Sequence, residues 1–336
     1  NLLAWIQRLR KAHSGNKQLA SWEAILLSRK GDFRAARLLL RDIYISSPND
    51  DQVAFSLALL ELSTERFSDA KKIFETLLES NYDSGSVNFH MGKISEVEKK
   101  FDYATKYYSD VPSDDSQNYV PSQLRLAFIL AKENKLLDSL ALLSDLSESF
   151  PSQVSRISLM EGYILSEKGQ YLEALEVYNG ALKKIDYDPD LLYARSLVAE
   201  KLGQLDILEN DLGRILEMEP NNAEVLNALG YSLTNLTDRH EEAYALIEKA
   251  LSLMPESFHI LDSMGWVCFR LGRIDDSIRY LTRAYSIEQD PEIVAHLIEA
   301  LWADEQRNRA RDLWTKATKE FPSDQRIRSL KHQLGL

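Results

Sequence analysis

Small residues recur in this chain at a nearly constant spacing of 34 or 35 residues, and this recurrence constrains the fold more than any other feature of the sequence. The series reaches Ile298, where a bulky residue stands 33 residues after the last small one. The small residues are Ala24, Ala58, Gly92, Ala127, Gly162, Ser196, Gly230 and Gly265. Self-similarity of this period over nine units predicts a repeat architecture, in which each unit buries its apolar face against its neighbours.

The stretch from His259 to Ala284 shows what one unit contains. Its apolar residues are spaced three and four apart in two blocks, which places one apolar stripe on each of two helices. Gly265 in the first block and Ser277 in the second are small enough to let the two helices pack closely. Gly272 lies between the blocks, where a residue that tolerates positive φ ends a helix. Each unit is therefore expected to be a helix, a turn and a second helix.

Other residue patterns keep the same register. The turn residue recurs as Gly31, Asn134, Gly169, Gly203 and Gly272. The small residue of the second helix recurs as Ala36, Ala70, Ala104, Ser139, Ala174, Ser277 and Ala310, and as Ala243 if one residue is inserted before it. All nine prolines lie at or near junctions between units, and proline inside a helix costs a hydrogen bond. The sequence thus predicts an all-α chain with no sheet.

This pattern resembles the tetratricopeptide (TPR) repeat. If Phe258 is position 1, six residues fall on positions 4, 7, 8, 15, 24 and 27 of that repeat, namely Leu261, Met264, Gly265, Gly272, Leu281 and Ala284. The resemblance implies a TPR solenoid, a right-handed superhelix of about nine helix-turn-helix repeats plus terminal helices. We expect one domain, residues 1–336, with an N-terminal helix in 1–16 and a capping helix in 325–336. The repeats should start near residues 17, 51, 85, 120, 155, 189, 223, 258 and 291.

The sixth repeat departs most from the pattern. Leu208 stands where a small residue is expected, and Gly213 lies inside the second helix. A bulky residue at the crossing is expected to push the two helices apart and change the local curvature. The alternative is a repacking without consequence, and the sequence leaves both open.

The charge of the chain is unevenly distributed. The net charge is −12, which argues against a nucleic-acid partner because such a protein must neutralise phosphates. Residues 1–48 nevertheless hold nine Lys or Arg and three Asp or Glu, so this end is +6 and the remainder is −18. The basic end could orient a partner, or it could be only a solvated helix face.

No sequence motif indicates catalysis. The six histidines are scattered without a metal-ligand spacing, and no nucleophile elbow, phosphate-binding glycine loop or cysteine pair is present. Cys268, the single cysteine, is expected to be an inert core thiol. We therefore expect a protein that is not an enzyme and that uses no cofactor and no metal.

By the TPR resemblance, the first helix of each repeat lines the concave face, chiefly through positions 2, 5, 9, 12 and 13. Aromatic residues fill these positions in nearly every repeat, and aromatic anchors are concentrated in protein interfaces. The alternative is that some of the rings only fill space between neighbouring first helices. The predicted partner-binding residues are Phe55, Phe89, Phe128, Tyr163, Tyr193, Tyr231, Trp266, Phe269, Arg270 and Trp302.

Positions 5 and 9 also test one well-known use of the repeat. Chaperone-binding TPR proteins hold a peptide carboxylate there with lysines and asparagines in successive repeats. Here the corresponding pairs are Tyr193 with Leu197, Asn227 with Tyr231, and Asp262 with Trp266. The carboxylate clamp is absent, which disfavours a cochaperone of that type.

Residues 221–322 carry a more specific resemblance. The phrases LNALGYSLTNLTDRHEEAYALIEKAL, LDSMGWVCFRLGRIDDSIRYLTRAY and DPEIVAHLIEALW resemble the C-terminal repeats of proteobacterial TPR outer-membrane lipoproteins, with a departure at Ile298 and Ala300. These proteins include adaptors for periplasmic C-terminal-processing proteases. The resemblance implies a scaffold at the periplasmic face of the outer membrane that brings such a protease together with its peptidoglycan (cell-wall) hydrolase substrates. The alternative is a scaffold for envelope polysaccharide export or outer-membrane assembly.

The helix expected over Leu2 to Ala12 begins without a capping residue. We therefore expect this chain to be cut from a longer one. The resemblance places a lipid anchor before Asn1, as the only membrane attachment.

Overall fold

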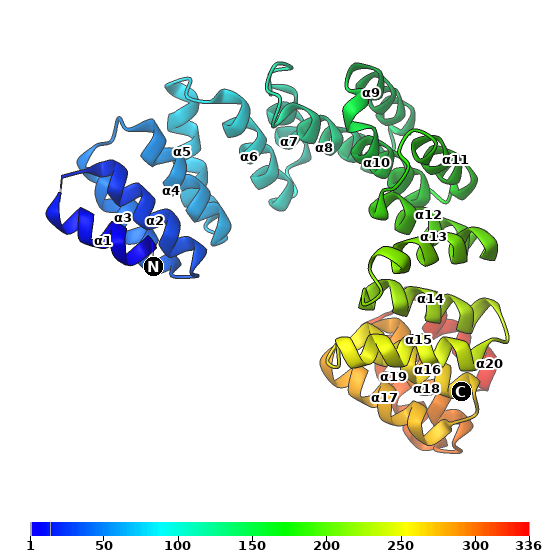
Figure 1. Cartoon of the computed structure of the whole chain (residues 1–336). Helices are drawn as coiled ribbons and strands as arrows, with labels where there is room; N and C mark the ends of the chain where they lie inside the picture. Colours follow the sequence, from blue (N-terminus) through cyan, green and yellow to red (C-terminus); the bar gives the residue numbers. More distant parts are fainter. Residues whose placement is uncertain (1, 14, 336) are drawn as a thin grey trace. The chain divides into compact units, whose positions relative to one another are not determined.

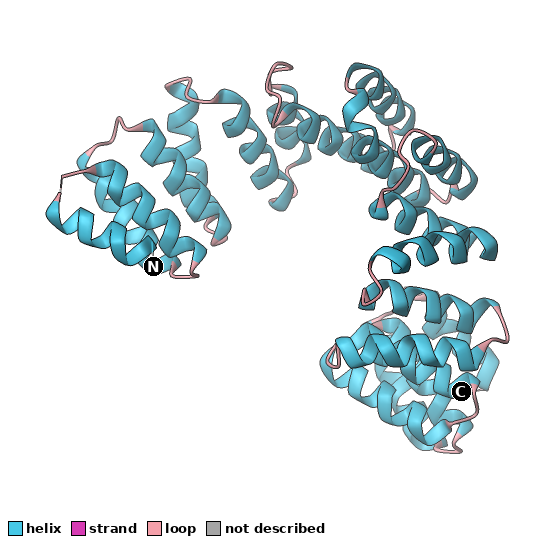
Figure 2. Cartoon of the chain, viewed as in Figure 1, coloured by secondary structure: helices cyan, strands magenta, loops and turns pink. Residues whose placement is uncertain are grey.

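The computed structural model describes residues 2–13 and 15–335. Over these residues the chain forms twenty α-helices, one short 3-10 helix and no strand (Figures 1 and 2). The expected all-α fold is confirmed over these residues.

The helices form consecutive pairs that follow the repeat pattern of the sequence. The first helices are α2 (Lys17–Arg29), α4 (Asp51–Ser63), α6 (Ser84–Val97), α8 (Tyr119–Lys132), α10 (Val154–Glu167), α12 (Pro189–Lys201), α14 (Ala223–Leu236), α16 (Phe258–Arg270) and α18 (Pro291–Ala303). The second helices are α3 (Phe33–Ser46), α5 (Phe67–Glu79), α7 (Phe101–Ser109), α9 (Leu136–Ser149), α11 (Tyr171–Leu182), α13 (Leu205–Met218), α15 (His240–Leu253), α17 (Ile274–Ile287) and α19 (Arg307–Glu320). The terminal helices are α1 (Leu2–Ala12) and α20 (Gln325–Leu334), and the 3-10 helix is Pro151–Gln153.

The turn inside most repeats depends on one residue in the left-handed conformation. Gly31, Gly169, Gly203 and Gly272 take positive φ there, as does Asn134. In three further repeats a residue with a long charged side chain takes positive φ at this position: Glu65, Lys99 and Glu305. The turn geometry is therefore kept even where the residue is not the one that adopts it most easily.

The small residue of the first helix sets how closely the two helices of a repeat approach. A Cβ placed on Gly265 of α16 would lie 2.5 Å from Cγ of Leu281 in α17. The same replacement at Gly92 of α6 would place a Cβ 2.5 Å from the ring of Tyr108 in α7. Glycine is required at these two positions because a large side chain of the second helix fills the space that a methyl group would take.

The chain divides into two compact units, residues 1–160 and 161–336, with the boundary inside α10. The N-terminal unit has a core in which α3, α4 and α5 contribute the fully buried side chains of Ala36, Ala58, Phe74 and Leu77. In the C-terminal unit, apolar clusters follow one another from α12 to α20. The expectation of one continuous domain stays a prediction.

The sixth repeat absorbs its irregular residue in the core. Leu208 of α13 is 1% exposed and packs in a cluster with Leu192, Leu212 and Ile215. A Cβ on Gly213 would meet no atom within 4 Å, so this glycine has no packing role. The helices α12 and α13 remain paired around the bulky residue.

Candidate functional site

A cavity of the C-terminal unit lies along four successive first helices, α12, α14, α16 and α18. We call it the C-terminal groove, and its volume is about 460 Å³. Its lining is formed by Tyr193, Leu197, Glu200, Glu224, Asn227, Ala228, Tyr231, Ser232, Met254, Ser257, His259, Ile260, Asp262, Ser263, Asp290, Glu292 and Ile293. Every lining residue comes from a first helix or from the loop that precedes one.

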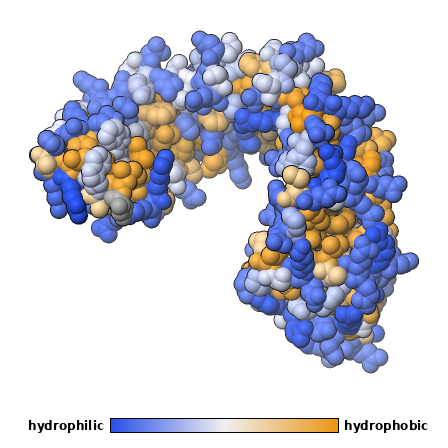
Figure 3. Space-filling view, viewed as in Figure 1, coloured by the Kyte–Doolittle hydropathy of each residue, from blue (hydrophilic) through white to orange (hydrophobic). Residues whose placement is uncertain are grey.

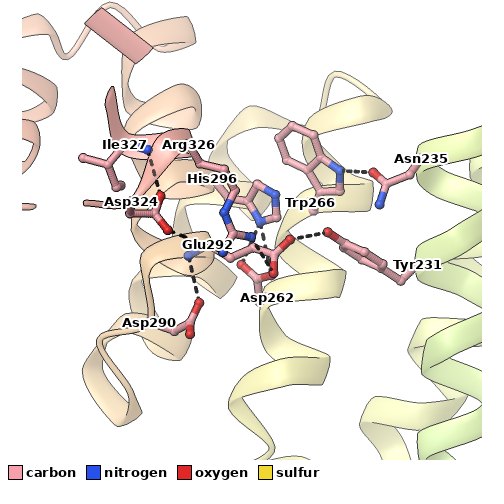
Figure 4. A network of polar contacts seen from close by, with 10 residues as sticks. All are labelled: Tyr231, Asn235, Asp262, Trp266, Asp290, Glu292, His296, Asp324, Arg326 and Ile327. Carbon is pink, nitrogen blue, oxygen red and sulfur yellow. Dashed lines mark hydrogen bonds and ion pairs between the residues drawn. The ribbon is translucent and has the colours of Figure 1, made fainter. Parts of the chain in front are cut away.

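A hydrogen bond between the first helices of two repeats that are separated by a third repeat forms part of one wall of the groove. The hydroxyl of Tyr231 in α14 donates to Oε1 of Glu292 in α18, at 2.6 Å (Figure 4). Burial of Tyr231, together with its bond to the carboxylate, raises the pKa of the phenol. The hydroxyl of Tyr231 therefore already has a hydrogen-bond partner within the chain, and this bond fixes the ring in the wall of the groove.

Glu292 also ties the terminal helix to the groove. Its Oε2 lies 2.9 Å from a terminal nitrogen of Arg326 in α20 (Figure 4). Burial opposes ionisation of Glu292, but the hydrogen bond from Tyr231 and the charge of Arg326 hold its pKa below the ordinary value. The carboxylate is therefore ionised and bonded on both oxygens.

A second set of contacts fixes Trp266 of α16 beside the groove. Its indole nitrogen donates to Oδ1 of Asn235 at 2.8 Å, and its ring stacks on His296 of α18, with centroids 4.1 Å apart. Nδ1 of His296 lies 3.0 Å from Oδ1 of Asp262, which lines the groove (Figure 4). Trp266 also stacks on Phe269 of its own helix at 5.1 Å. These rings hold α14, α16 and α18 to one another.

The groove carries negative charge. None of its described lining residues is a lysine or an arginine. Five carboxylates line it, namely Glu200, Glu224, Asp262, Asp290 and Glu292. Burial raises the pKa of Tyr193, and the charges of Glu224 and Glu200 raise it further. The phenol of Tyr193 therefore lies in the field of two carboxylates at the α12 end of the groove.

The predicted partner-binding residues of the C-terminal unit divide between the groove and its surroundings. Tyr193 and Tyr231 line the groove, whereas Trp266 and Phe269 form the stack beside it. The other three lie outside the groove. Tyr163 is 47% exposed, and Arg270 is also exposed. The centroid of the Trp302 ring lies 4.0 Å from the guanidinium carbon of Arg307.

In the N-terminal unit, the three predicted phenylalanines contact side chains of their own unit. The ring of Phe55 packs edge-on to that of Phe74, with centroids 6.0 Å apart. The ring centroids of Phe89 and Tyr108 are 6.1 Å apart. Phe128 lies under the cations of Arg125 and Lys132, at 5.1 and 4.6 Å. These contacts suit the space-filling alternative, and whether any of the rings also binds a partner stays a prediction.

Comparison with known proteins gives the family of the repeat. Residues 22–81 match the family model for the tetratricopeptide repeat. The chain therefore contains tetratricopeptide repeats, shown by the family model over residues 22–81. It is 37% identical over 215 residues to the TPR repeat-containing protein PA4667 of Pseudomonas aeruginosa, an alignment that covers 64% of this chain and 36% of that protein. It is 23% identical over 185 residues to the TPR repeat-containing protein YpiA of Bacillus subtilis, covering 54% of this chain and 43% of YpiA.

Solved structures agree on the fold. A TPR protein from Parabacteroides merdae has a TM-score of 0.60 at 16% identity, covering 74% of this chain and 97% of that one. PilW, a type IV pilus biogenesis factor, has a TM-score of 0.54 at 13% identity, covering 64% of this chain and 99% of PilW. These similarities show the TPR fold alone. The chain spans 16 to 43% of the length of the curated relatives it matches.

The acidic residues of this TPR groove were not among the predicted site residues. Glu224, His259 and Glu292 occupy position 2 of their repeats, and Glu200 occupies position 12. Both positions belong to the set expected to line the concave face. Reading them for charge as well as for aromatic rings would have identified Glu200, Glu224 and Glu292, but not Asp290, which precedes α18.

A second exposed surface lies on the first TPR helices. The side chains of α1 and α2 enclose a shallow cavity of about 270 Å³, over which hydrophobic residues reach the surface (Figure 3). Trp5 is 56% exposed and Trp22 is 46% exposed. The lining residues are Leu2, Trp5, Ile6, Trp22, Ile25, Leu26 and Arg29. This surface belongs to the basic end of the TPR chain.

The chemical expectations can be compared with the described part of the TPR chain. Cys268 is 1% exposed, and burial raises the pKa of its thiol to about 11, which keeps it protonated at neutral pH. No group of three His, Cys, Asp or Glu residues there is arranged to hold a metal ion. In the same residues, every helix is too short or too polar to cross a membrane.

Proposed function

We propose that this chain is a non-catalytic scaffold that binds other proteins, and that the C-terminal groove is its principal binding site. The observation that carries the proposal is the groove itself, in which four first helices present aromatic and polar side chains to one cavity. Ligand sites are commonly concave and combine apolar walls with a few placed polar groups. TPR repeats serve this purpose because stacked units give an extended binding surface.

We further propose that the chain acts as an adaptor at the periplasmic face of the bacterial outer membrane. It would bring a C-terminal-processing protease together with its cell-wall hydrolase substrates. Support for this finer role comes from the resemblance of residues 221–322 to TPR outer-membrane lipoproteins. Holding protease and substrate on one solenoid raises their effective concentration without changing the chemistry of either.

The proposal is tested by purifying the full-length native protein from its source membranes and identifying the bound proteins by mass spectrometry. Recovery of a processing protease together with a peptidoglycan hydrolase supports the adaptor. Recovery of a polysaccharide synthase, a porin or an assembly machine instead replaces the adaptor with the other envelope scaffold. If nothing is bound specifically, the scaffold proposal itself is wrong.

The groove is tested in the same purification with Tyr193→Ala. Tyr193 lines the groove and takes no part in the Tyr231 and Trp266 contacts, but its ring packs against the cluster around Leu208. Circular dichroism and thermal unfolding of Tyr193→Ala therefore accompany the purification. The matched control is Tyr171→Ala, on the second helix α11 and outside the groove. Loss of one partner with Tyr193→Ala alone assigns that partner to the groove, whereas equal recovery with both variants removes Tyr193 from the binding surface.

A further inference from the structure

We propose that the C-terminal groove binds a short, extended segment of a partner protein that carries a lysine or arginine, with its cationic side chain against Tyr193 between Glu200 and Glu224. This inference rests on the proposed scaffold function and adds the chemistry of the ligand. It reverses the charge preference of a carboxylate clamp, because the groove offers anions where such a clamp offers lysines.

The charge of the lining determines the sign of the ligand. Five carboxylates face a cavity of about 460 Å³, and His259 is the single basic residue among the lining residues described. Four of the carboxylates have partners inside the chain: Glu292 is bonded by Tyr231 and Arg326, Asp262 lies against His296, Asp290 accepts from the backbone N–H of Glu292, and Glu200 accepts from the hydroxyl of Ser232. Ser232 carries no charge, so neither Glu200 nor Glu224 is paired with a cation among the described residues. Negative charge at the α12 end is left for a ligand to balance, since electrostatic complementarity selects partners and speeds their association.

The α12 end also has the shape that a long cationic side chain requires. Leu197, which is 43% exposed, lines the groove one turn after Tyr193 on the same helix. The methylene stem of a lysine or arginine can cover Leu197 while the head group lies over the ring of Tyr193. Glu200 and Glu224 supply the carboxylates, and both are close enough to raise the pKa of the Tyr193 phenol. An apolar stem, an aromatic face and two anions thus occur together.

The peptide backbone of the segment also has a partner in the groove. Oδ1 of Asn227, in the middle of the lining, is buried and accepts no hydrogen bond from the described residues. A buried acceptor without a donor is unfavourable, and rotation of the amide towards the cavity would let a peptide N–H satisfy it. The amide nitrogen of the same side chain can donate to a peptide carbonyl. An extended main chain is the ligand that meets both halves of this amide.

The chain already places one guanidinium at this acidic surface. Arg326, on the terminal helix, pairs with Glu292 of α18 at 2.9 Å (Figure 4). The pairing shows that a carboxylate of this lining can bind an arginine at an ordinary ion-pair distance. A partner segment would make the equivalent contact at the α12 end.

The test uses the whole chain and a fluorescent, end-blocked peptide in which lysine alternates with glycine and leucine. Matched peptides carry glutamine or glutamate in place of every lysine. We expect the lysine peptide to bind and the other two not to bind, with affinity falling as salt is added. Because both ends of the peptide are blocked, a terminal carboxylate cannot account for binding.

Two protein variants locate the interaction. Glu200→Gln combined with Glu224→Gln should weaken the lysine peptide by about tenfold or more, since two anions beside the cation are lost. Glu217→Gln combined with Glu248→Gln makes the same change of charge on second helices outside the groove, and we expect less than about a twofold effect. Equal weakening by the two pairs would mean diffuse attraction and would overturn the proposal.

A photo-crosslinking lysine peptide with the unmutated protein gives a readout that does not depend on variant folding. Adducts on α12, α14, α16 or α18 support the groove, and adducts confined to other helices overturn it. The Glu200/Glu224 variant is then used to purify the native partner. If the partner is retained undiminished and no lysine peptide binds, the scaffold stands and the charge assignment is wrong. If the peptide binds in the groove but no protein is ever retained, the ligand chemistry stands and the scaffold function is wrong.

Discussion

At the scale of single residues, glycine at the helix crossing determines how closely the two helices of a repeat pack. Gly265→Ala places a Cβ 2.5 Å from Cγ of Leu281 and 3.2 Å from its backbone nitrogen. The neighbour is a buried side chain with its own backbone, so it cannot simply move aside. We expect the free energy of unfolding to fall by about 1 to 3 kcal/mol, the usual cost of overpacking.

The control for this prediction is Gly213→Ala in α13. A Cβ at Gly213 meets no atom within 4 Å, so only helix propensity changes. This variant should raise the free energy of unfolding by about 0.5 to 1 kcal/mol. Urea denaturation of both variants measures the two effects, and a destabilised Gly213→Ala would show that propensity is not the governing factor.

His90 makes the N-terminal unit sensitive to acid. Its ring stacks on Phe74, with centroids 5.7 Å apart, and its Nδ1 is buried without a hydrogen-bond partner among the described residues. Burial, helped by the charge of Lys93, lowers the pKa of His90 from 6.5 to about 4. The protonated ring is thus disfavoured in the folded state, and its neutral form stabilises the fold above pH 6.5.

We therefore expect stability to fall between pH 6.5 and about 4, by on the order of 2 to 3 kcal/mol from this residue. His90→Phe keeps an aromatic ring beside Phe74 and should remove most of the pH dependence in that range. His13→Gln, a change at an exposed histidine of the same unit, should leave the dependence unchanged. Urea unfolding at a series of pH values compares the three proteins.

At the scale of the helix, a buried ion pair joins three consecutive elements. Arg195 of α12 makes two hydrogen bonds to Asp211 of α13, at 2.7 and 2.6 Å, and a third to Asn179 of α11 at 2.7 Å. Asp211 is completely buried. Arg195→Met would leave this carboxylate buried without a counter-charge, and we expect a loss of about 3 to 5 kcal/mol of stability.

Arg214→Met in α13 is the matched control for the ion pair. Arg214 donates to the backbone oxygen of Asp186 in an exposed contact. Its replacement should cost less than about 1 kcal/mol. Thermal unfolding followed by circular dichroism compares the variants, and similar melting temperatures for both would show that the burial of Asp211 does not matter.

The helices could be predicted from the sequence because their signals are local. Positions such as Gly265 and Gly272 specify a close crossing and a turn, so the first helices begin within one residue of the expected repeat starts. The groove could be predicted only in part. Tyr231 donates a hydrogen bond to Glu292, which lies two repeats further along the chain. This contact depends on how successive repeats are oriented, and the sequence of a single repeat does not encode that orientation. The rings of Trp266 and His296 likewise meet across separate repeats.

At the scale of the whole molecule, each compact unit has its own core. We expect a fragment of residues 154–336, which keeps α10 to α20 intact, to fold alone, because contacts in a solenoid are made chiefly between neighbouring repeats. It should show a helical circular dichroism spectrum and one cooperative unfolding transition. It should also bind the lysine peptide as the whole chain does.

A fragment of residues 237–336 is the control for the groove. It lacks α12 and α14, and with them Tyr193, Glu200, Glu224 and Tyr231. Helicity with no peptide binding would be expected from it. If the longer fragment is instead unfolded, the C-terminal unit depends on residues before 154 for its stability.

The bond between Tyr231 and Glu292 has a consequence for how this protein can change during evolution. Repeat arrays commonly grow or shrink by duplication or loss of whole units, which is tolerated when each unit touches only the next. Here one intervening unit, and no other number, lets the phenol reach the carboxylate. Duplication of α16 and α17 would separate the two groups and leave Glu292 with Arg326 alone. A change in the number of units between α14 and α18 would therefore cost this bond, whereas a change elsewhere in the array would keep it.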